Sequence, residues 1–174
     1  MFEKGDLVTY GCKGVCEVKN ITTLNLEGIP KDRLYYEMQS MVNGSRIFSP
    51  VGQEEKNAMR AVLTKEEAEE LLGQLPECRL CWEKDERRRE ETYRRIINHS
   101  DARGMLCMIR TITDYGRERV LEGRRMPAMD GRYLKAAEDN LYAELSIAME
   151  IPRSALKEYM AARMGELSGA LQAL

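Results

Sequence analysis

Apolar and polar positions follow two different periods in the two halves of the chain. From Asp6 to about Val62 the apolar residues come in short runs, such as LVTY, GVCEV and RIFSPV, separated by Gly, Asn and Pro. This pattern is typical of strands joined by turns. Asn43-Gly44 predicts a tight hairpin, and NLEGIPKD (25–32) predicts a second hairpin tip. The first sixty residues therefore favour five strands in a small β-barrel or open sheet.

The period becomes helical near Thr64. Thr64 and Glu67 have the spacing of a capping box, and the apolar stripe that follows ends at Gly73. Beyond this short helix, four more are predicted over 82–98, 101–115, 130–149 and 152–164. Ser100 or Asp101 is the candidate N-cap of the helix over 101–115, and Asp130 that of the helix over 130–149. The predicted core of this helical bundle is Ile96, Ile97, Leu106, Ile109, Ile112, Leu134, Leu141, Leu145, Ala148, Leu156 and Met160.

These patterns predict an α+β protein, with an N-terminal small Tudor/SH3-like β-barrel domain followed by an all-α helical bundle domain. The β domain is expected over 1–63, a short helix and linker over 64–77, the helical domain over 78–164 and a tail over 165–174.

The formal charge of −2 hides a change in the type of basic residue along the chain. Residues 1–76 hold 6 Lys and 3 Arg, whereas residues 77–174 hold 3 Lys and 15 Arg. Between Arg79 and Arg132 there are 14 basic and 10 acidic residues. Arginine suits bidentate contact with phosphate and fits narrow minor grooves, so this region favours a nucleic-acid-binding face. The alternative is a solvated helix whose arginines pair with glutamates.

Residues that would carry catalysis are few. The only histidine, His99, lies at a helix junction, and the chain has no glycine loop for phosphate and no cluster of His, Asp and Glu at metal spacing. We therefore expect no enzymatic activity, no cofactor and no metal site.

The cysteines come closest to a chemical site. An odd number, five, in a chain without an apolar export signal predicts reduced thiols rather than a disulfide framework. Cys107 lies among apolar residues and is expected in the core. One alternative is a four-thiolate zinc site, for which the ligands would be Cys12, Cys16, Cys78 and Cys81.

The single tryptophan, Trp82, lies at the head of the charged stretch CWEKDERRREETYRR. If residues 82–98 form a helix, Trp82 belongs to its first turn or cap. The helix then contains i,i+4 pairs such as Asp85–Arg89 and Glu90–Arg94, each stabilising by only about 0.2–0.5 kcal/mol. An aromatic ring beside cations can wedge into a base step while the cations hold the flanking phosphates.

Several motifs together resemble the CarD-like (CarD/CdnL) bacterial transcription regulators. They are the opening FEKGDLVTYGCKGVCEV, the SRIFSPV hairpin, the tryptophan that heads a charged helix, and YLKAAEDNLYAELSIAM late in the chain. The resemblance covers the chain to about residue 163. It implies a Tudor-like domain that binds the RNA polymerase β subunit, and a helical domain that contacts promoter DNA at the upstream edge of the melted bubble.

The resemblance also implies roles for particular residues. The expected DNA-binding residues are Trp82, Lys84, Arg87, Arg88 and Arg132. The expected polymerase-binding residues are Arg46, Ile47 and Phe48. The chain is then a non-enzymatic, monomeric factor of the bacterial cytoplasm that stabilises the promoter open complex, with no membrane partner. Two alternatives stay open, namely a protein-interaction adaptor without a direct DNA role, and a zinc- or thiol-dependent regulator.

Overall fold

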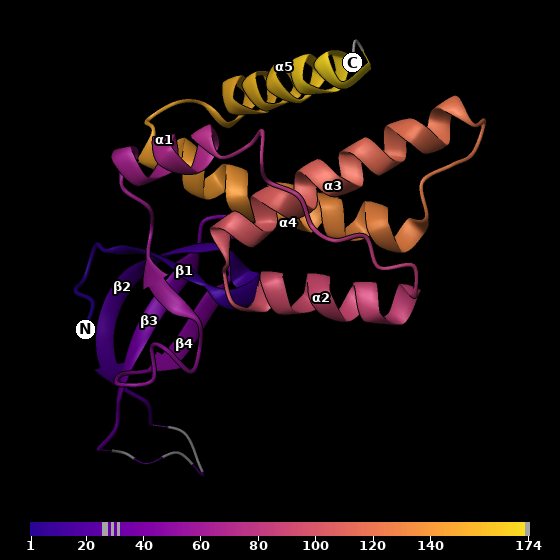
Figure 1. Cartoon of the computed structure of the whole chain (residues 1–174). Helices are drawn as coiled ribbons and strands as arrows, with labels where there is room; N and C mark the ends of the chain where they lie inside the picture. The colour runs from indigo at the N-terminus through magenta and orange to yellow at the C-terminus, as the bar shows by residue number, and fades with distance from the viewer. Residues whose placement is uncertain (26–27, 29, 31, 173–174) are drawn as a thin grey trace. The chain divides into compact units, whose positions relative to one another are not determined.

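The computed structural model describes residues 1–25, 28, 30 and 32–172, with side chains to residue 166 (Figure 1). Contacts divide the chain into two compact units. Unit 1 comprises Met1–Val62 and Asn98–Ser100, and unit 2 comprises Leu63–Ile97 and Asp101–Leu174. An N-terminal antiparallel sheet followed by helices makes the α+β prediction correct.

Unit 1 is a five-stranded antiparallel sheet in the order β4-β3-β2-β1-β5. Its strands are β1 (Leu7–Tyr10), β2 (Val15–Thr23), β3 (Leu34–Ser40), β4 (Arg46–Pro50) and β5 (Met59–Ala61), and a 3₁₀ turn (Gly11–Lys13) joins the first two. Of the two predicted forms, a small β-barrel or an open sheet, the structure has the open sheet, because β4 and the three-residue β5 each pair with a single neighbour among the described residues. The sheet is open, although its fold agrees with a Tudor-like domain.

The predicted hairpin at Asn43-Gly44 is confirmed between β3 and β4. Gly44 has a φ of +71°, which is easily adopted only without a Cβ, and the Asn43 side chain accepts a hydrogen bond from the Ser45 amide. The second predicted tip, NLEGIPKD, lies largely outside the described residues.

The core of unit 1 centres on Tyr36, which is fully buried among apolar side chains that include Val18 and Met38. Its hydroxyl donates a 2.6 Å hydrogen bond to Glu54 Oε1 and accepts one from the Phe2 amide. The bond from Tyr36 stabilises the ionised carboxylate and lowers the pKa of Glu54. The buried Tyr36 hydroxyl thereby has a hydrogen-bond partner in Glu54, which lies 18 residues further along the chain.

Unit 2 is helical. Its helices are α1 (Lys65–Gly73), α2 (Glu86–Asn98), α3 (Ala102–Leu121), α4 (Ala128–Ala148) and α5 (Arg153–Gln172). The predicted capping box of α1 is confirmed, since Thr64 and Glu67 exchange side-chain-to-backbone hydrogen bonds. Asp101 caps α3 through the Gly104 amide, as predicted.

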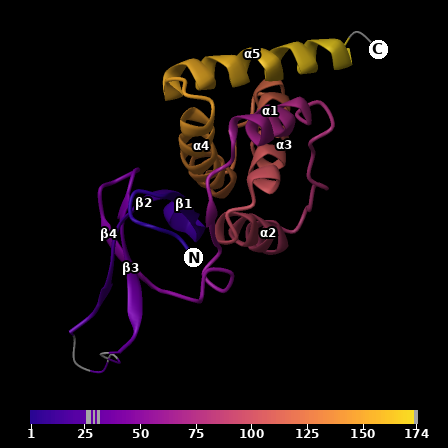
Figure 2. The same cartoon turned by 90° about the vertical axis from the view of Figure 1, so that its left-hand side faces the viewer.

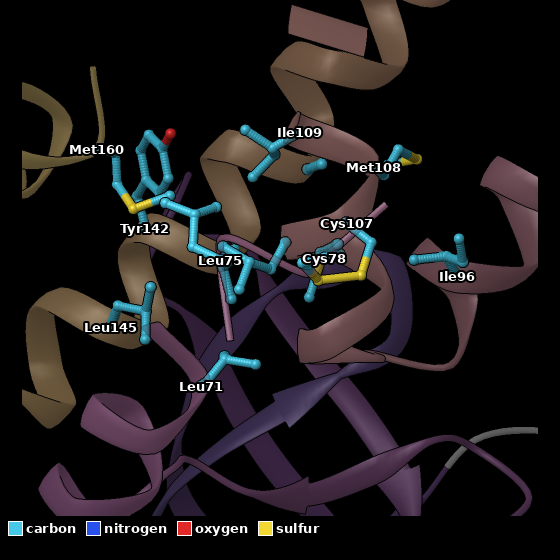
Figure 3. Close-up of a cluster of buried hydrophobic side chains, with 14 of the residues drawn as sticks. Leu71, Leu75, Cys78, Ile96, Cys107, Met108, Ile109, Tyr142, Leu145 and Met160 are labelled. Atoms are coloured by element: carbon cyan, nitrogen blue, oxygen red, sulfur yellow. A yellow bond between two sulfur atoms is a disulfide. The ribbon is translucent and has the colours of Figure 1, made fainter. Parts of the chain in front are cut away.

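The helices of unit 2 share one hydrophobic core. α3 packs along α4, and both α1 and α5 contact α4 (Figure 2). Every predicted core residue lies in this cluster or packs against it, with only Leu134 and Ala148 partly exposed. Figure 3 shows buried side chains from α1, α3, α4 and α5 around Leu75, with Cys78 bonded to Cys107 beside them.

Two helices are longer than predicted. α3 continues to Leu121 rather than 115, and α5 continues to Gln172 rather than 164. The continuation of α3 includes Gly116, which sequence reasoning treats as a weak helix residue. A Cβ at Gly116 would lie 2.3 Å from Met126 Cε, so the glycine allows close packing instead of ending the helix.

Candidate functional site

Trp82 lies in an extended segment before α2, not in the helix itself. α2 begins at Glu86, because Asp85 accepts a 3.0 Å hydrogen bond from the Arg88 amide and so caps the first turn. The predicted helix start at residue 82 is therefore wrong by four residues. Trp82 is half-buried, and its ring packs against Tyr115 of α3 with centroids 4.0 Å apart.

A buried arginine also contacts the Trp82 ring, and Trp82, Tyr115, Arg89 and Asp130 together are called the Trp82 site. The guanidinium carbon of Arg89 lies 4.6 Å from the Trp82 ring centroid, within the range of a cation–π contact. The Arg89 Nη1 also donates a 2.9 Å hydrogen bond to the Glu83 carbonyl oxygen, next to the tryptophan. One side chain therefore holds both the indole ring and the backbone that carries it.

Arg89 is itself fixed by Asp130 of α4. Two 2.9 Å hydrogen bonds join its Nε and Nη2 to the two carboxylate oxygens, and Asp130 is fully buried. Tyr93 donates a third hydrogen bond to the same carboxylate at 3.1 Å. The hydrogen bonds that Arg89 donates to Asp130 raise the pKa of the Arg89 guanidinium, while burial, with help from the Asp130 charge, raises the pKa of Tyr93. The Arg89 guanidinium therefore stays protonated.

Two predictions about Arg89 and Asp130 are corrected by this pair. Arg89 pairs with Asp130 rather than with Asp85, which is occupied by the helix cap. Asp130 does not cap α4, whose N-cap is Pro127, but lies inside its first turn and turns toward α2. Another of the predicted i,i+4 pairs, Glu90–Arg94, is present at 3.4 Å.

Three of the predicted DNA-binding cations, Lys84, Arg87 and Arg88, are exposed. Arg87 and Arg88 lie in the first turn of α2, whose opposite face is buried, and no ion pair joins these three side chains to another described residue. Their charges therefore face solvent within six residues of Trp82. This is the arrangement that a phosphate-contacting flank requires.

Arg132 differs from those cations because it already has a partner. It lies on α4, and its Nη2 is 3.2 Å from Glu90 Oε1 on α2. Tyr133 and Arg94 contact the same carboxylate. The structure thus brings Arg132 to α2 with part of its charge compensated.

Sequence reasoning missed Arg89, Asp130 and Tyr115 as parts of the Trp82 site. One signal was available, since Arg89 is spaced four and seven residues before Tyr93 and Ile96, which both lie on the buried face of α2. No local signal links Trp82 to Tyr115, which is 33 residues away.

The cysteines depart from the prediction of reduced thiols. Cys78 and Cys107 form a disulfide, and Cys12, Cys16 and Cys81 are free. Cys107 is buried, as expected. Burial raises the pKa of the Cys16 thiol to about 11, with Lys13 opposing. The alternative of a four-thiolate zinc site is contradicted because Cys78 is bonded to another sulfur, and no potential metal cluster occurs among the described residues.

The predicted polymerase-binding residues lie on β4, an edge strand of the sheet. Arg46 and Phe48 share one face, where the Arg46 guanidinium carbon lies 5.1 Å from the Phe48 ring centroid and the Arg46 Nη2 lies 2.5 Å from Glu37 Oε1. Ile47 points the other way and packs against the core of unit 1. The accessible part of this set is therefore the exposed Arg46, the half-buried Phe48 and the edge of β4 that pairs with no other described strand.

Comparison with protein families identifies unit 1. Residues 2–63 match the family model described as the CarD-like/TRCF RID domain. This domain is a non-catalytic RNA polymerase-interacting domain, which supports a general role in polymerase binding. The match covers residues 2–63 alone, and it confirms the predicted resemblance over this N-terminal part of the chain. No curated protein matches the chain. Within the described residues, no helix is long and apolar enough to cross a membrane.

Proposed function

We propose that this chain is a bacterial transcription regulator that binds the RNA polymerase β subunit through unit 1 and stabilises the promoter open complex through unit 2. It works as a monomer in the cytoplasm and catalyses no reaction. The observation that carries the proposal is the match of residues 2–63 to an RNA polymerase-interacting domain. An edge of β4 that pairs with no other described strand is suited to adding a strand from a partner protein.

The DNA contact is proposed at the Trp82 site. Trp82 is partly exposed and rests on Tyr115 and Arg89, so a ring that inserts at a base step is already oriented. Lys84, Arg87 and Arg88 offer exposed charges for the neighbouring phosphates, with Arg132 contributing once Glu90 releases it. Partial unstacking of a base step requires about a few kcal/mol, so the wedge acts on DNA that the polymerase has already distorted at the upstream edge of the bubble.

An adaptor without a DNA role is the second candidate. One observation favours it: the positive charges of two arginines near Trp82 are already compensated, that of Arg89 by Asp130 and that of Arg132 by Glu90. Open-complex lifetime separates the two candidates, because an adaptor leaves it unchanged when Trp82 is replaced.

Polymerase capture tests the first half of the proposal. The immobilised full-length chain is expected to retain bacterial RNA polymerase, and Arg46→Ala and Phe48→Ala are each expected to weaken retention by about fivefold or more, as truncated interface anchors do. Lys56→Ala, an exposed cation outside β4, is the matched control and should bind as wild type does. Circular dichroism checks that each variant is folded. Failure of the wild-type chain to retain polymerase contradicts the proposal, and unchanged retention by both β4 variants contradicts the assigned surface.

A further inference from the structure

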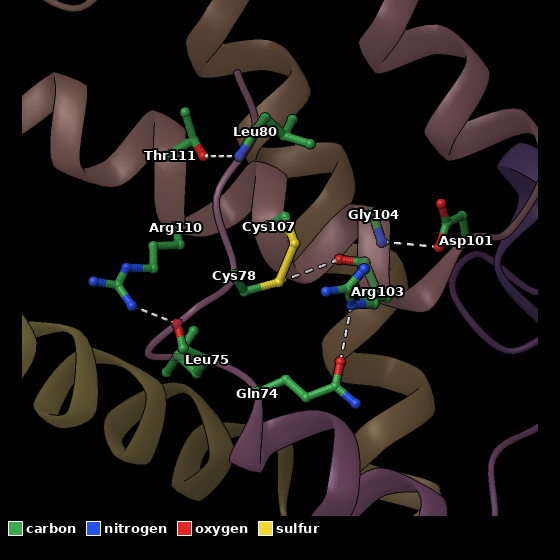
Figure 4. The surroundings of a disulfide bond; sticks show 10 residues. All are labelled: Gln74, Leu75, Cys78, Leu80, Asp101, Arg103, Gly104, Cys107, Arg110 and Thr111. Atoms are coloured by element: carbon green, nitrogen blue, oxygen red, sulfur yellow. Dashed lines mark hydrogen bonds between the residues drawn. A yellow bond between two sulfur atoms is a disulfide. The ribbon is translucent and has the colours of Figure 1, made fainter. Parts of the chain in front are cut away.

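The segment between α1 and α2 carries Trp82 but has no helix or strand of its own over residues 78–85. It lies along α3 instead (Figure 4). Arg110 of α3 donates a hydrogen bond to the Leu75 carbonyl, and the Leu80 amide donates a 2.9 Å bond to Thr111 Oγ1. A segment held in this way depends on its contacts with α3 for its position, because it lacks internal backbone pairing.

One of those contacts is covalent. The disulfide joins Cys78, four residues before Trp82, to Cys107 of α3. On the other side of Trp82 the contacts are non-covalent, namely the Tyr115 ring and the Arg89 bond to Glu83. Among the described residues, this disulfide is the single covalent restraint on where the segment runs.

We propose that the Cys78–Cys107 bond is a redox-responsive clamp that positions Trp82 for its DNA contact. The inference rests on the proposed function, since RNA polymerase works in a compartment where thiols are kept reduced. Disulfides in such compartments are usually transient and redox-sensing rather than permanent. The oxidised form holds the segment on α3 and presents the ring in a fixed place, whereas the reduced form loosens it and weakens the contact.

The surroundings of the two cysteines can also accommodate the reduced thiols. Cys78 Sγ lies 3.7 Å from the Arg103 carbonyl oxygen. A disulfide sulfur has no proton to donate, but the thiol of reduced Cys78 has this acceptor within reach. Cys107 is surrounded by apolar side chains in the core, where a thiol behaves as a small hydrophobic group. Cleavage of the bond therefore leaves no buried polar group without a partner.

The chemistry is a two-electron exchange. A low-molecular-weight disulfide takes two electrons and two protons from the Cys78 and Cys107 thiols, so that the protein S–S bond forms and two small thiols are released. A cellular dithiol reverses the exchange and becomes a disulfide itself. Both cysteines are buried, so the reagent reaches them when the 78–85 segment lifts from α3.

Trp82 fluorescence tests the clamp directly, because the chain has no other tryptophan. The full-length chain is oxidised with glutathione disulfide or reduced with dithiothreitol, and intact-mass alkylation under denaturing conditions counts its thiols. We expect three alkylated cysteines after oxidation and all five after reduction. Reduction should increase acrylamide quenching of Trp82, and Cys107→Ser should be quenched as reduced wild type is under both treatments.

Cys81→Ser is the matched control. It removes an exposed thiol next to Trp82 without removing the bond, so it should respond to both reagents as wild type does. Quenching that is the same in the oxidised and reduced chain, or an oxidised chain that keeps five free thiols, overturns the clamp.

Open-complex lifetime connects the clamp to function. Oxidised wild type and Cys81→Ser should extend the lifetime more than Cys107→Ser does, and no redox reagent is needed in the assay once the chain has been desalted. If all three proteins extend the lifetime equally, although Trp82 is quenched more strongly in Cys107→Ser than in the oxidised wild type, the link between the clamp and the DNA contact is overturned. No extension by any of them, with quenching still redox-dependent, leaves the clamp in place and contradicts the proposed function instead.

Discussion

Replacing Asp130 by alanine is expected to lower the free energy of unfolding of unit 2 by about 3–5 kcal/mol. Asp130 is fully buried and is the counter-charge of Arg89, whose side chain is 8% exposed. The variant leaves the guanidinium buried without a compensating charge, and it also removes the acceptor of the Tyr93 hydroxyl. Urea unfolding followed by Trp82 fluorescence measures the effect, because the only tryptophan lies in this unit.

Asp139→Ala is the matched control on the same helix. The Asp139 carboxylate is 35% exposed and pairs with Lys135 and Arg153, so its loss should change the free energy of unfolding by less than about 1 kcal/mol. Equal effects of the two substitutions would contradict a structural role for the buried pair. A large loss with Asp130→Ala should also increase the exposure of Trp82 in the native state, since Arg89 then loses its fixed position.

The second large effect is expected for Leu106→Ala. Leu106 of α3 is fully buried in the core of unit 2, and truncation of a buried leucine typically lowers the free energy of unfolding by about 2–5 kcal/mol through lost burial and the cavity left behind. The same Trp82 fluorescence, measured against urea, reports the change.

Leu121→Ala controls for the chemistry of the substitution. Leu121 ends the same helix and is 78% exposed, so its truncation should stay within about 0.5 kcal/mol of wild type. If both leucine variants lose the same stability, α3 does not bury the face that the structure assigns to it.

The sequence was sufficient for features that depend on local or periodic patterns. Thr64 and Glu67 are three residues apart, so their capping box can be predicted from the sequence, and the structure confirms it. The predicted core of unit 2 followed from helical spacing and is also confirmed. The choice between a barrel and an open sheet could not be made in the same way, because closure depends on whether edge strands meet in space.

The contacts around Trp82 show why the long-range pairs were not predicted from the sequence. Arg89 and Asp130 are 41 residues apart, and Cys78 and Cys107 are 29 residues apart. Each pair forms because elements that are distant in the chain lie together in unit 2. The spacing of apolar residues along the sequence does not indicate which elements lie together. A charged residue on a helix also has a local candidate partner, as Arg89 has in Asp85, and local spacing alone favours the wrong one.

The central claim is that the chain lengthens the life of the promoter open complex through Trp82. The measurement that tests it most directly is open-complex lifetime on a bacterial promoter, with no factor, wild type or a folded Trp82→Ala variant. Base–aromatic stacking contributes about 1–3 kcal/mol, so wild type is expected to extend the lifetime by about fivefold to a hundredfold and Trp82→Ala to give the lifetime without factor. An equal extension by both proteins, or none by wild type while polymerase is still captured, would contradict the account.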